Sequence, residues 1–251
     1  MHVRDAVDEE IESIRDVALA SLTASYGHAV AEELLGDAVE RWYDADELGE
    51  DVTDPNTVFL VAEIDDDVVG FAESYVIDRR DRVGEIDWLH VHPDHRGEGV
   101  GSALLEAVET ALRDADVDAV EGRVLVDNEA GVAFYERGGY DHAGDRYVDI
   151  GDETFTENVY VESGIESDDD WSAVDELELD DETVYVSYGE AVRGSQAPFY
   201  SAYETEDQSS RYGWFCGHCD SIDNAMDSMG RIECNACGNR RKATRWDSSY
   251  L

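Results

Sequence analysis

The residues best placed to do chemistry in this sequence form a glycine-rich turn, Arg96–Gly101. The turn follows a strand-like run, Ile86–Val91, and precedes a run with helical spacing, Ser102–Leu112. Because glycine has no Cβ, the backbone N–H groups of such a turn can converge on a phosphate group. The first N–H groups of a helix also lack partners within the helix, and the helix dipole adds partial positive charge beside them. The spacing therefore predicts an anion-binding loop between a strand and a helix.

Three kinds of phosphate-binding loop compete for this turn. A Walker A loop requires Gly-Lys-Ser/Thr, and the turn contains no lysine. A dinucleotide fingerprint places its first glycine directly after the strand, whereas residues 92–96 separate the two here. The third pattern, Arg/Gln-x-x-Gly-x-Gly, is matched by Arg96, Gly99 and Gly101. A glycine-rich turn without a ligand is the remaining alternative.

A second segment follows an apolar, strand-like run, Ala119–Val126. Residues 128–140 read Asn-Glu-Ala-Gly-Val-Ala-Phe-Tyr-Glu-Arg-Gly-Gly-Tyr, with apolar residues at helical spacing and two glycines that end the helix. The segment is similar to the pattern Asn-x-x-Ala-x-x-Phe-Tyr-x-x-x-Gly-Phe/Tyr, with Ala130 or Ala133 at the alanine position. Because the two segments occur in the right order, residues 1–162 resemble the GNAT superfamily of N-acetyltransferases.

The resemblance implies a binding site for acetyl-CoA. In that family the backbone of the strand before the turn pairs with the pantetheine arm, the turn holds the pyrophosphate, and an asparagine hydrogen-bonds the cofactor arm. The family's tyrosine, matched by Tyr135, donates a proton or a hydrogen bond to the departing sulfur. The structural alternatives are a core aromatic at Tyr135 and a helix N-cap at Asn128. The implied cofactor-binding residues are Leu89, His90, Val91, Arg96, Gly97, Glu98, Gly99, Val100, Gly101, Ser102, Asn128 and Tyr135.

A carboxylate near the start of the strand before the turn is the candidate catalytic base. Glu85 lies where some GNAT subfamilies place a catalytic glutamate, and Asp87 shares its face if side chains alternate along the strand. The same alternation puts His90 on the opposite face. A solvated acid at Glu85, with the proton taken by water, is the alternative. His92 and His95 are interpreted as loop residues.

The amine acceptor is not named by the sequence. In the family, recognition of the acceptor comes mostly from the first two helices and the last pair of strands. Aromatic side chains beside acids suit a cationic amine, although aromatics at helical spacing are usually part of the core. Protein N-termini, lysines, polyamines and small amines all stay open as acceptors. The corresponding segments here carry Tyr26, His28, Trp42, Tyr43, Glu47 and Tyr147.

All four cysteines lie near the C-terminus, as two Cys-x-x-Cys pairs separated by 14 residues. The spacing predicts a tetrahedral zinc site and resembles a zinc ribbon. Four sulfur ligands close the coordination shell, so the metal is expected to be structural. Disulfides are the alternative, and they are rare in a reducing cytosol. No cysteine occurs in the first 200 residues, which excludes thiol catalysis in the main domain. The predicted ligands are Cys216, Cys219, Cys234 and Cys237.

The composition is strongly acidic throughout. Asp and Glu number 62 against 18 Lys and Arg, giving a net charge of −44, and the acids are spread through segments that keep apolar periodicity. Salt screens such self-repulsion, so we interpret the composition as that of a salt-adapted, haloarchaeal-type folded protein. An acidic surface for a basic partner is the alternative. No run is apolar enough to span a membrane and no signal pattern occurs, so a cytoplasmic protein without a membrane partner is expected.

The only basic cluster with an adjacent indole follows the last cysteine. Arg240, Arg241, Lys242 and Arg245, with Trp246 beside them, could contact nucleic-acid phosphate and stack a base. The interpretation we prefer is that this cluster docks onto the acidic main domain. A nucleic-acid partner is the alternative, and the oligomeric state is not determined by the sequence.

The candidate residues need a sheet to position them. The order strand–helix–helix–three strands–helix–strand–helix–two strands predicts an α/β fold with an α+β mixed sheet covered on both faces, similar to the GNAT layout. The expected domains are a GNAT-like domain at 1–162, an acidic linker at 163–181 with a short helix near 173–179, and a β-rich zinc-ribbon module at 182–251. Strands are expected at 2–4, 57–64, 68–77, 85–91, 119–126, 140–150, 154–161, 183–188 and 198–203, and helices at 9–25, 29–47, 100–114 and 130–137.

Together these patterns predict an acetyl-CoA-dependent N-acetyltransferase that moves an acetyl group from the thioester to a primary amine. Two alternatives stay open. One is a non-catalytic module that binds or senses acyl-CoA. The other is a transferase that its ribbon directs to a ribosomal or RNA-associated substrate.

Overall fold

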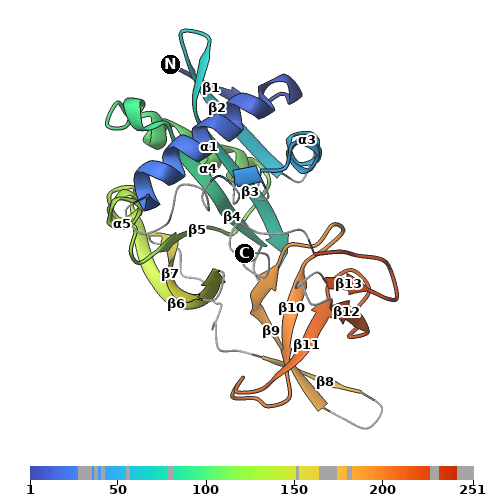
Figure 1. Cartoon of the computed structure of the whole chain (residues 1–251). Helices are drawn as coiled ribbons and strands as arrows, with labels where there is room; N and C mark the ends of the chain where they lie inside the picture. The colour runs from blue at the N-terminus through green and yellow to red at the C-terminus, as the bar shows by residue number, and fades with distance from the viewer. Residues whose placement is uncertain are drawn as a thin grey trace. The chain divides into compact units, whose positions relative to one another are not determined.

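The structure of the protein is a computed structural model, which describes residues 1–27, 36, 39–40, 43–54, 57–78, 82–150, 153–163, 174–179, 183–226 and 232–241 (Figure 1). The chain divides into two compact units. The first unit consists of Met1–Val76, Gly84–Tyr147 and Phe155–Ile165. The second unit consists of Ile77–Val83, Val148–Thr154 and Glu166–Leu251.

The first unit contains most of a seven-stranded sheet, of which the strand ends at residues 77–78, 82–83, 148–150 and 153–154 are grouped with the second unit. Its strands are β1 (His2–Asp5), β2 (Thr57–Ile64), β3 (Asp67–Asp78), β4 (Arg82–Val91), β5 (Ala119–Leu125), β6 (Tyr140–Ile150) and β7 (Glu153–Glu162), and its helices are α1 (Ile11–Tyr26), α3 (Ala45–Thr53), α4 (Val100–Asp114) and α5 (Glu129–Arg137). The strand order is β1-β2-β3-β4-β5-β7-β6. β2 pairs antiparallel with β1 and β3, and β5 pairs antiparallel with β7. Helix α4 joins the neighbours β4 and β5, which is the connection that a parallel pair requires. The predicted mixed α/β sheet is confirmed.

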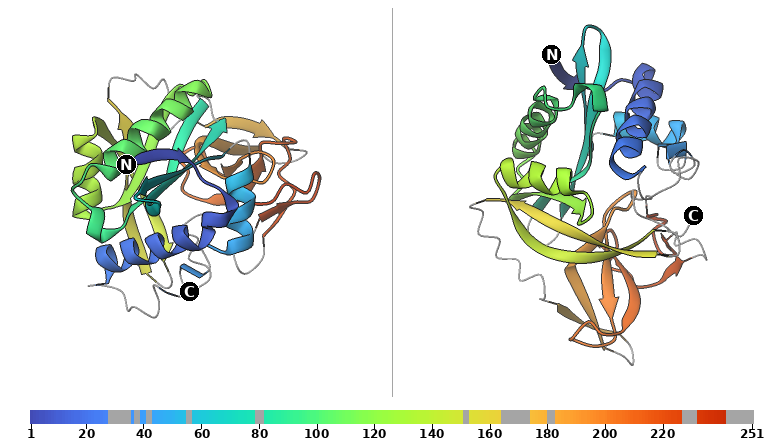
Figure 2. Two further views of the ribbon diagram at one scale, coloured as in Figure 1. Left: turned by 90° about the horizontal axis from the view of Figure 1, so that it is seen from above. Right: turned by 60° about the vertical axis from the view of Figure 1, so that its left-hand side comes forward.

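Helices cover both faces of this sheet. α1 and α3 lie on one face, and α4 and α5 lie on the other (Figure 2). Helix α4 buries Leu104, Val108 and Leu112, which recur at helical spacing and form one core cluster with the sheet. The apolar side of α1 packs with Phe71 and Trp88 in a second cluster on the opposite face. The two clusters fix the sheet between its helix layers.

Strand β4 changes face at Asp87. Ile86 belongs to the core cluster under α4, whereas Trp88, two residues further on, belongs to the cluster under α1. Strict alternation would place Ile86 and Trp88 on the same face. We therefore infer an extra residue of the β-bulge type at this point, a device that redirects side chains near functional sites.

This change of face corrects the predicted orientation of His90. The ring centroids of His90 and Phe71 are 5.2 Å apart, so His90 lies on the face covered by α1. Tyr75 shares that face with Phe71 because side chains alternate along β3, and its hydroxyl donates a hydrogen bond to Glu85 at 2.9 Å. Glu85 and His90 therefore share one face, although an uninterrupted strand would separate them.

The second unit is made of short strands. They are β8 (Asp175–Glu178), β9 (Thr183–Val192), β10 (Phe199–Tyr203), β11 (Arg211–Cys216), β12 (Asn224–Met226) and β13 (Ile232–Cys234). Four of them form a sheet in the order β11-β10-β9-β8, and β12 and β13 pair antiparallel. Phe199, Cys216, Ile232 and Cys234 form a small buried cluster. Two of the four cysteines are thus part of the core of this unit.

The short helix predicted near residues 173–179 is wrong. This segment contains β8, whose residues pair antiparallel with β9, with Glu176 opposite Tyr185 and Leu177 opposite Val184. The charged sequence of β8 carries little intrinsic preference for a strand. Its conformation follows from the backbone hydrogen bonds that the edge of β9 offers, which is a tertiary effect.

The predicted helix over residues 29–47 lies mostly outside the described residues. The described part corrects the prediction: residues 36, 39 and 40 are helical, Tyr43 lies in a turn, and a separate helix, α3, runs from Ala45 to Thr53. The Asp44 carboxylate accepts a hydrogen bond from the Asp46 N–H at 3.0 Å, which suits the start of a helix. Leu48 is buried in the core cluster under α1, and this contact holds α3 as a separate helix after the turn.

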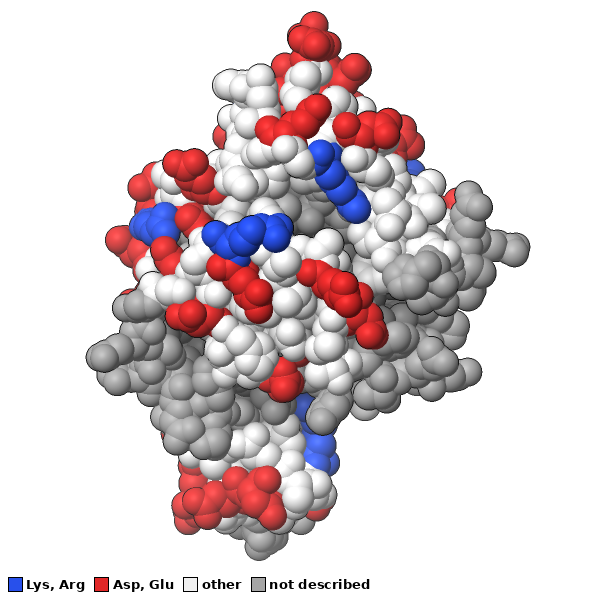
Figure 3. Space-filling model, turned by 90° about the vertical axis from the view of Figure 1, so that its left-hand side faces the viewer, with Lys and Arg blue, Asp and Glu red and all other residues white. Residues whose placement is uncertain are grey.

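The surface reflects the acidic composition. Acidic side chains are scattered over much of the face drawn in Figure 3, and few basic ones lie between them. Among the helices of the described residues, none combines the length and the apolar character needed to cross a bilayer.

Candidate active site and metal centre

The glycine-rich turn has the backbone that the sequence predicts for an anion-binding loop. Gly97 and Gly99 adopt positive φ angles of 81° and 86°, a region that residues with a Cβ rarely enter. Gly99 is the N-cap of α4, and the Ala103 N–H donates to the Gly99 carbonyl at 3.0 Å. The N–H groups of Val100–Ser102 therefore precede the first hydrogen bond within the helix and have no acceptor there.

The side chain of Arg96 is directed to α1. Its NH2 group donates to the Ser21 carbonyl at 3.1 Å, to the Ser21 hydroxyl at 3.0 Å and to the Ser25 hydroxyl at 3.2 Å. Its Nε donates to the Val91 carbonyl at 3.3 Å. Burial lowers the pKa of Arg96 from its ordinary value. Arg96 thus joins the turn to α1 and to the end of β4.

A buried hydrogen-bonded network continues from Ser21 into the core. The Ser21 hydroxyl lies 2.9 Å from Nδ1 of His90, and Nε2 of His90 lies 3.0 Å from the Tyr43 hydroxyl. Tyr43, His90 and Ser21 are all buried. The network links Tyr43, a predicted acceptor-side aromatic, to Arg96 in the turn, and sequence patterns alone did not find it.

Glu85 lies in a buried ion pair. Its carboxylate pairs with the Arg123 guanidinium from β5 and also accepts the hydrogen bond from Tyr75. Glu85 is 1 % exposed, so the solvated acid considered for this position is not what the fold provides. Burial lowers the pKa of Arg123. The nearby carboxylates, with Glu85 the strongest of them, raise it above its ordinary value. The sequence offered one signal for Arg123, a single cation inside an apolar strand.

Tyr135 packs tightly against β5 and β7. It is 6 % exposed, and its ring stacks on Tyr160 with centroids 5.6 Å apart and an interplanar angle of 11°. A Cβ at Gly122 would lie 2.2 Å from the Tyr135 ring and 2.6 Å from its hydroxyl oxygen. Gly122 therefore lets the tyrosine rest directly on the strand backbone, and this contact fixes where the hydroxyl lies.

Asn128 makes the N-cap hydrogen bond considered for it. Its Oδ1 accepts from the Gly131 N–H at 3.0 Å at the start of α5. Its Nδ2 donates to the Tyr26 hydroxyl at 3.2 Å, which joins α5 to the end of α1. The structure thus brings Asn128 and the predicted acceptor residue Tyr26 together.

The remaining predicted cofactor residues are distributed along the end of β4 and the turn. Leu89 and Val91 are partly buried against the core cluster under α4. The Glu98 carboxylate lies 3.1 Å from Nδ1 of His95, and Ser102 is exposed on the first turn of α4. Of the predicted acceptor residues, His28 and Trp42 and the side chains of Glu47 and Tyr147 lie outside the described part of the chain.

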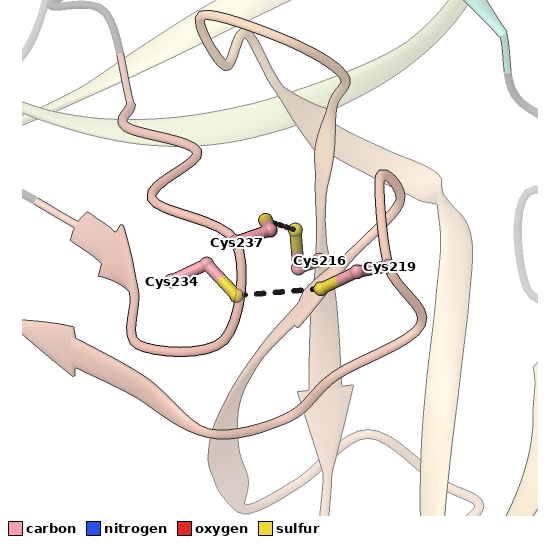
Figure 4. Close-up of side chains that lie close together, drawn as sticks. All are labelled: Cys216, Cys219, Cys234 and Cys237. Atoms are coloured by element: carbon pink, nitrogen blue, oxygen red, sulfur yellow. Dashed lines mark hydrogen bonds between the residues drawn. The ribbon is translucent and has the colours of Figure 1, made fainter.

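The four cysteines come together in the second unit. Figure 4 shows that their side chains point toward one another. Sγ of Cys216 lies 3.7 Å from that of Cys237, Sγ of Cys219 lies 3.5 Å from that of Cys234, and all four atoms lie within 4.8 Å of one another. All four cysteines are free thiols. A tetrahedral zinc ion with sulfur at about 2.3 Å requires sulfur atoms about 3.8 Å apart, so this donor set fits zinc.

The environment of Cys234 favours its charged form. Burial opposes a thiolate there, but the N–H groups of Cys237 and Ala236 and the Cys219 thiol lower the pKa of Cys234 to about 7. Metal ions bind the thiolate and not the thiol. Burial raises the pKa values of Cys219 and Cys237, so the N–H groups around the cluster favour the thiolate at Cys234 first.

The described members of the basic cluster make contacts inside the second unit. Arg240 pairs with Glu233 at 3.3 Å, and the Arg241 guanidinium lies 5.6 Å from the centre of the Trp214 ring. Lys242, Arg245 and Trp246, which complete the cluster in the sequence, lie outside the described residues.

Two regions of the chain match known families. Residues 180–251 match a "Family of unknown function (DUF5816)", and residues 14–140 match the "Acetyltransferase (GNAT) family". The structure of PaiA N-acetyltransferase from Thermoplasma acidophilum in complex with coenzyme A is 21% identical, covers 62% of this chain and 96% of its own, and has a TM-score of 0.54.

A GCN5-related N-acetyltransferase from Rhodopseudomonas palustris is 23% identical, covers 64% of this chain and 94% of its own, and has a TM-score of 0.53. At these identities the structures show a shared fold. The match to the family covers half of the chain and includes β4, the glycine turn and Tyr135. The chain belongs to the GNAT family of acetyltransferases.

Proposed function

We propose that the protein transfers an acetyl group from acetyl-CoA to an amine. The observation that carries the proposal is the turn at Gly97–Gly99, which follows β4 after a short 3-10 turn at Pro93–His95, opens α4 and leaves the N–H groups of Val100–Ser102 without acceptors inside the helix. Such amides suit a pyrophosphate. Coenzyme A is present in the structure of the similar acetyltransferase from Thermoplasma acidophilum.

In the proposed reaction the acceptor nitrogen attacks the carbonyl carbon of the thioester. The C–S bond then breaks, the acetyl group stays on nitrogen, and the sulfur leaves as a thiolate. The backbone of Leu89–Val91 holds the thioester and polarises its carbonyl oxygen. Tyr135 gives its proton to the thiolate. The nitrogen loses one proton to a base, and Tyr135 regains one proton from solvent, so the proton count balances over the cycle.

The contacts of Glu85 bear on which group takes the proton from the amine. Glu85 is the predicted base, but its carboxylate already holds Arg123 and Tyr75 in a buried site. Protonation would remove the charge that offsets a buried guanidinium, which is costly. We therefore propose that Glu85 positions Arg123 and that water accepts the amine proton.

The test is acetylation of an amine panel by purified protein in concentrated KCl, followed by release of free coenzyme A and by mass detection. Tyr135→Phe is expected to lower kcat about 100-fold, the size expected for a lost general acid, while calorimetry gives unchanged coenzyme A affinity. Tyr212→Phe, at an exposed position of the second unit, is the control. Binding without turnover on every amine would instead identify an acyl-CoA-binding module. If coenzyme A gives no heat, both assignments fail.

We also propose that the cysteine cluster holds a structural zinc ion, with Cys216, Cys219, Cys234 and Cys237 as ligands. Bound there, zinc supplies folding free energy to a segment with a small core. Mass spectrometry of the purified chain is expected to find one zinc per protein, lost in Cys219→Ser. Metal content that is unchanged in this variant would contradict the site. A reducing, cytoplasmic compartment follows from the need for reduced thiols.

A further inference from the structure

Asn239 is a fully buried polar side chain beside the cysteine cluster. Its Nδ2 donates to the backbone carbonyl of Ala197 at 2.8 Å and to Sγ of Cys216 at 3.4 Å. Its Oδ1 accepts from the Gln196 N–H at 2.9 Å and from the Ser195 hydroxyl at 3.4 Å. An asparagine amide has two N–H donors and one oxygen with two lone pairs. Both N–H donors and both lone pairs of the Asn239 amide have hydrogen-bond partners. One of these partners, Cys216, is a predicted metal ligand.

The segment that Asn239 holds is the connection between β9 and β10. This connection, residues 193–198, is hydrogen-bonded to the turns of both cysteine pairs. The Gly217 N–H, in the first pair, donates to the Pro198 carbonyl at 2.9 Å. Beside the second pair, the Ser195 N–H donates to the Arg240 carbonyl at 2.7 Å, and the Arg240 N–H donates to the Ser195 hydroxyl at 3.1 Å.

The backbone of this connection packs closely on the Asn239 amide. A Cβ at Gly194 would lie 2.8 Å from Oδ1 of Asn239 and 2.1 Å from the carbonyl oxygen of Ala197. Only glycine fits at this distance. The amide is therefore enclosed on one side by the connection and on the other by the Cys216 sulfur.

The negative charge of a four-thiolate zinc site explains a role for the Asn239 N–H donor beside Cys216. Four thiolates and one zinc dication carry a net charge of −2, and Cys216 and Cys234 are buried. N–H groups aimed at the sulfur atoms offset that charge, as outer hydrogen bonds do at many metal sites. Cys234 receives N–H groups from its own turn, whereas Cys216 receives the side chain of Asn239.

We propose that Asn239 is a positioning residue of the metal centre, which donates to the Cys216 thiolate and couples metal binding to the order of the β9–β10 connection. The inference rests on the proposed zinc site. It makes two claims that can be measured separately, one about metal affinity and one about the backbone of residues 195 and 196.

The first test compares metal affinity in two variants of the full chain. Asn239→Asp keeps the shape and the acceptor oxygen but loses both N–H donors and places a carboxylate against the sulfur. Zinc affinity, measured by competition with a chromogenic chelator, is expected to fall about 10- to 100-fold, and the sulfur-to-metal charge-transfer band of bound Co²⁺ is expected to shift. Ser195→Ala removes a bond to Oδ1 and leaves both Nδ2 donors, so its affinity and band are expected to stay within about threefold of the unaltered protein.

The second test uses hydrogen exchange of the Ser195 and Gln196 amides in the unaltered chain. Both amides are expected to be protected with zinc bound and to exchange at least tenfold faster after chelation. This measurement needs no variant, so it decides the coupling even if Asn239→Asp fails to fold.

The outcomes separate the two proposals. If the unaltered chain binds zinc but Asn239→Asp binds it equally well with the same Co²⁺ band, the positioning role is wrong and the zinc site stands. If protection of residues 195 and 196 does not change on chelation, the coupling is wrong. If the unaltered chain binds neither zinc nor Co²⁺, the zinc site and the inference fail together.

Discussion

At the scale of single residues, the buried pair of Glu85 and Arg123 ties β4 to β5 below the proposed thioester site. The carboxylate sits at a position where the family resemblance implied a base, yet it is enclosed with the guanidinium and with Tyr75. A buried charge is stable only with its partner, because removal from water is expensive. The pair is therefore expected to contribute mainly to the stability of the fold and less to catalysis.

Replacing Arg123 tests this expectation. Arg123→Met leaves the Glu85 carboxylate buried without the guanidinium and is expected to lower the free energy of unfolding by about 3–5 kcal/mol, measured by urea denaturation. The double variant Glu85→Leu/Arg123→Met is expected to recover part of that loss, since the Glu85 charge is gone while Glu121 and Glu157, also near Arg123, stay buried without the guanidinium.

The matched control is Arg113→Met on the exposed side of α4, where Arg113 pairs with Glu162 at 2.5 Å. A surface ion pair of this kind contributes at most about 1 kcal/mol. Equal losses at the two arginines would contradict a special role for Arg123.

Arg96 is the residue that connects the glycine turn to the rest of the fold. Arg96→Ala removes the hydrogen bonds to Ser21 and Ser25 and is expected to weaken coenzyme A binding about tenfold, as charge-assisted hydrogen bonds of about 1.5–3 kcal/mol hold the turn in place. The KM for acetyl-CoA should rise more than kcat falls. Arg137→Ala, at the exposed end of α5, is the control, and calorimetry in the two variants decides.

At the scale of elements, the contact between α5 and β5 sets the place of the proposed acid. Gly122→Ala would push a methyl group into the Tyr135 ring. We expect a loss of about 1–3 kcal/mol in stability and a fall in kcat that approaches the effect of Tyr135→Phe, with coenzyme A affinity retained.

Gly144→Ala in β6 is the control for this prediction, because a Cβ there meets nothing within 4 Å. Unfolding experiments and steady-state kinetics on both variants provide the measurement. A Gly122→Ala protein with full activity would show that the position of the Tyr135 hydroxyl is unimportant for turnover.

The change of face in β4 is also an element-scale feature. It turns Trp88 and His90 toward α1 while Leu89 and Val91 pack on the α4 side. The strand thereby presents a buried imidazole to Tyr43 and Ser21 directly before the turn. The change of face therefore joins Tyr43, Ser21 of α1 and Arg96 of the glycine-rich turn in one hydrogen-bonded network through His90.

At the scale of the whole molecule, the net charge of −44 is the dominant property. Repulsion between so many carboxylates opposes folding, and screening lengths fall to about 3 Å at 1 M salt. The melting temperature is expected to rise by several degrees between 0.15 M and 2 M KCl and to change much less in sucrose of equal osmolality. Scanning calorimetry in the two solutes is the measurement. A melting temperature that does not change with KCl concentration would contradict the salt-adapted interpretation.

The sequence by itself determined the order of elements in the first unit and the turn chemistry, because both depend on local patterns. Helix α4 occupies the predicted residues 100–114, and Asp65 and Asp66 take the positive φ angles expected of the acidic turn before β3. The spacing of the two cysteine pairs likewise predicted that the four cysteines lie close together.

Only the tertiary structure decided which side chains meet. The sequence predicted neither the partner of Glu85, nor the face of His90, nor the strand β8, because an ion pair across strands, a bulge and an edge pairing depend on chain segments far apart in sequence. Local spacing encodes backbone conformation, whereas burial and hydrogen bonding are set by neighbours that folding supplies. Asn239 illustrates this most clearly, since its four partners identify it and its own flanking residues do not.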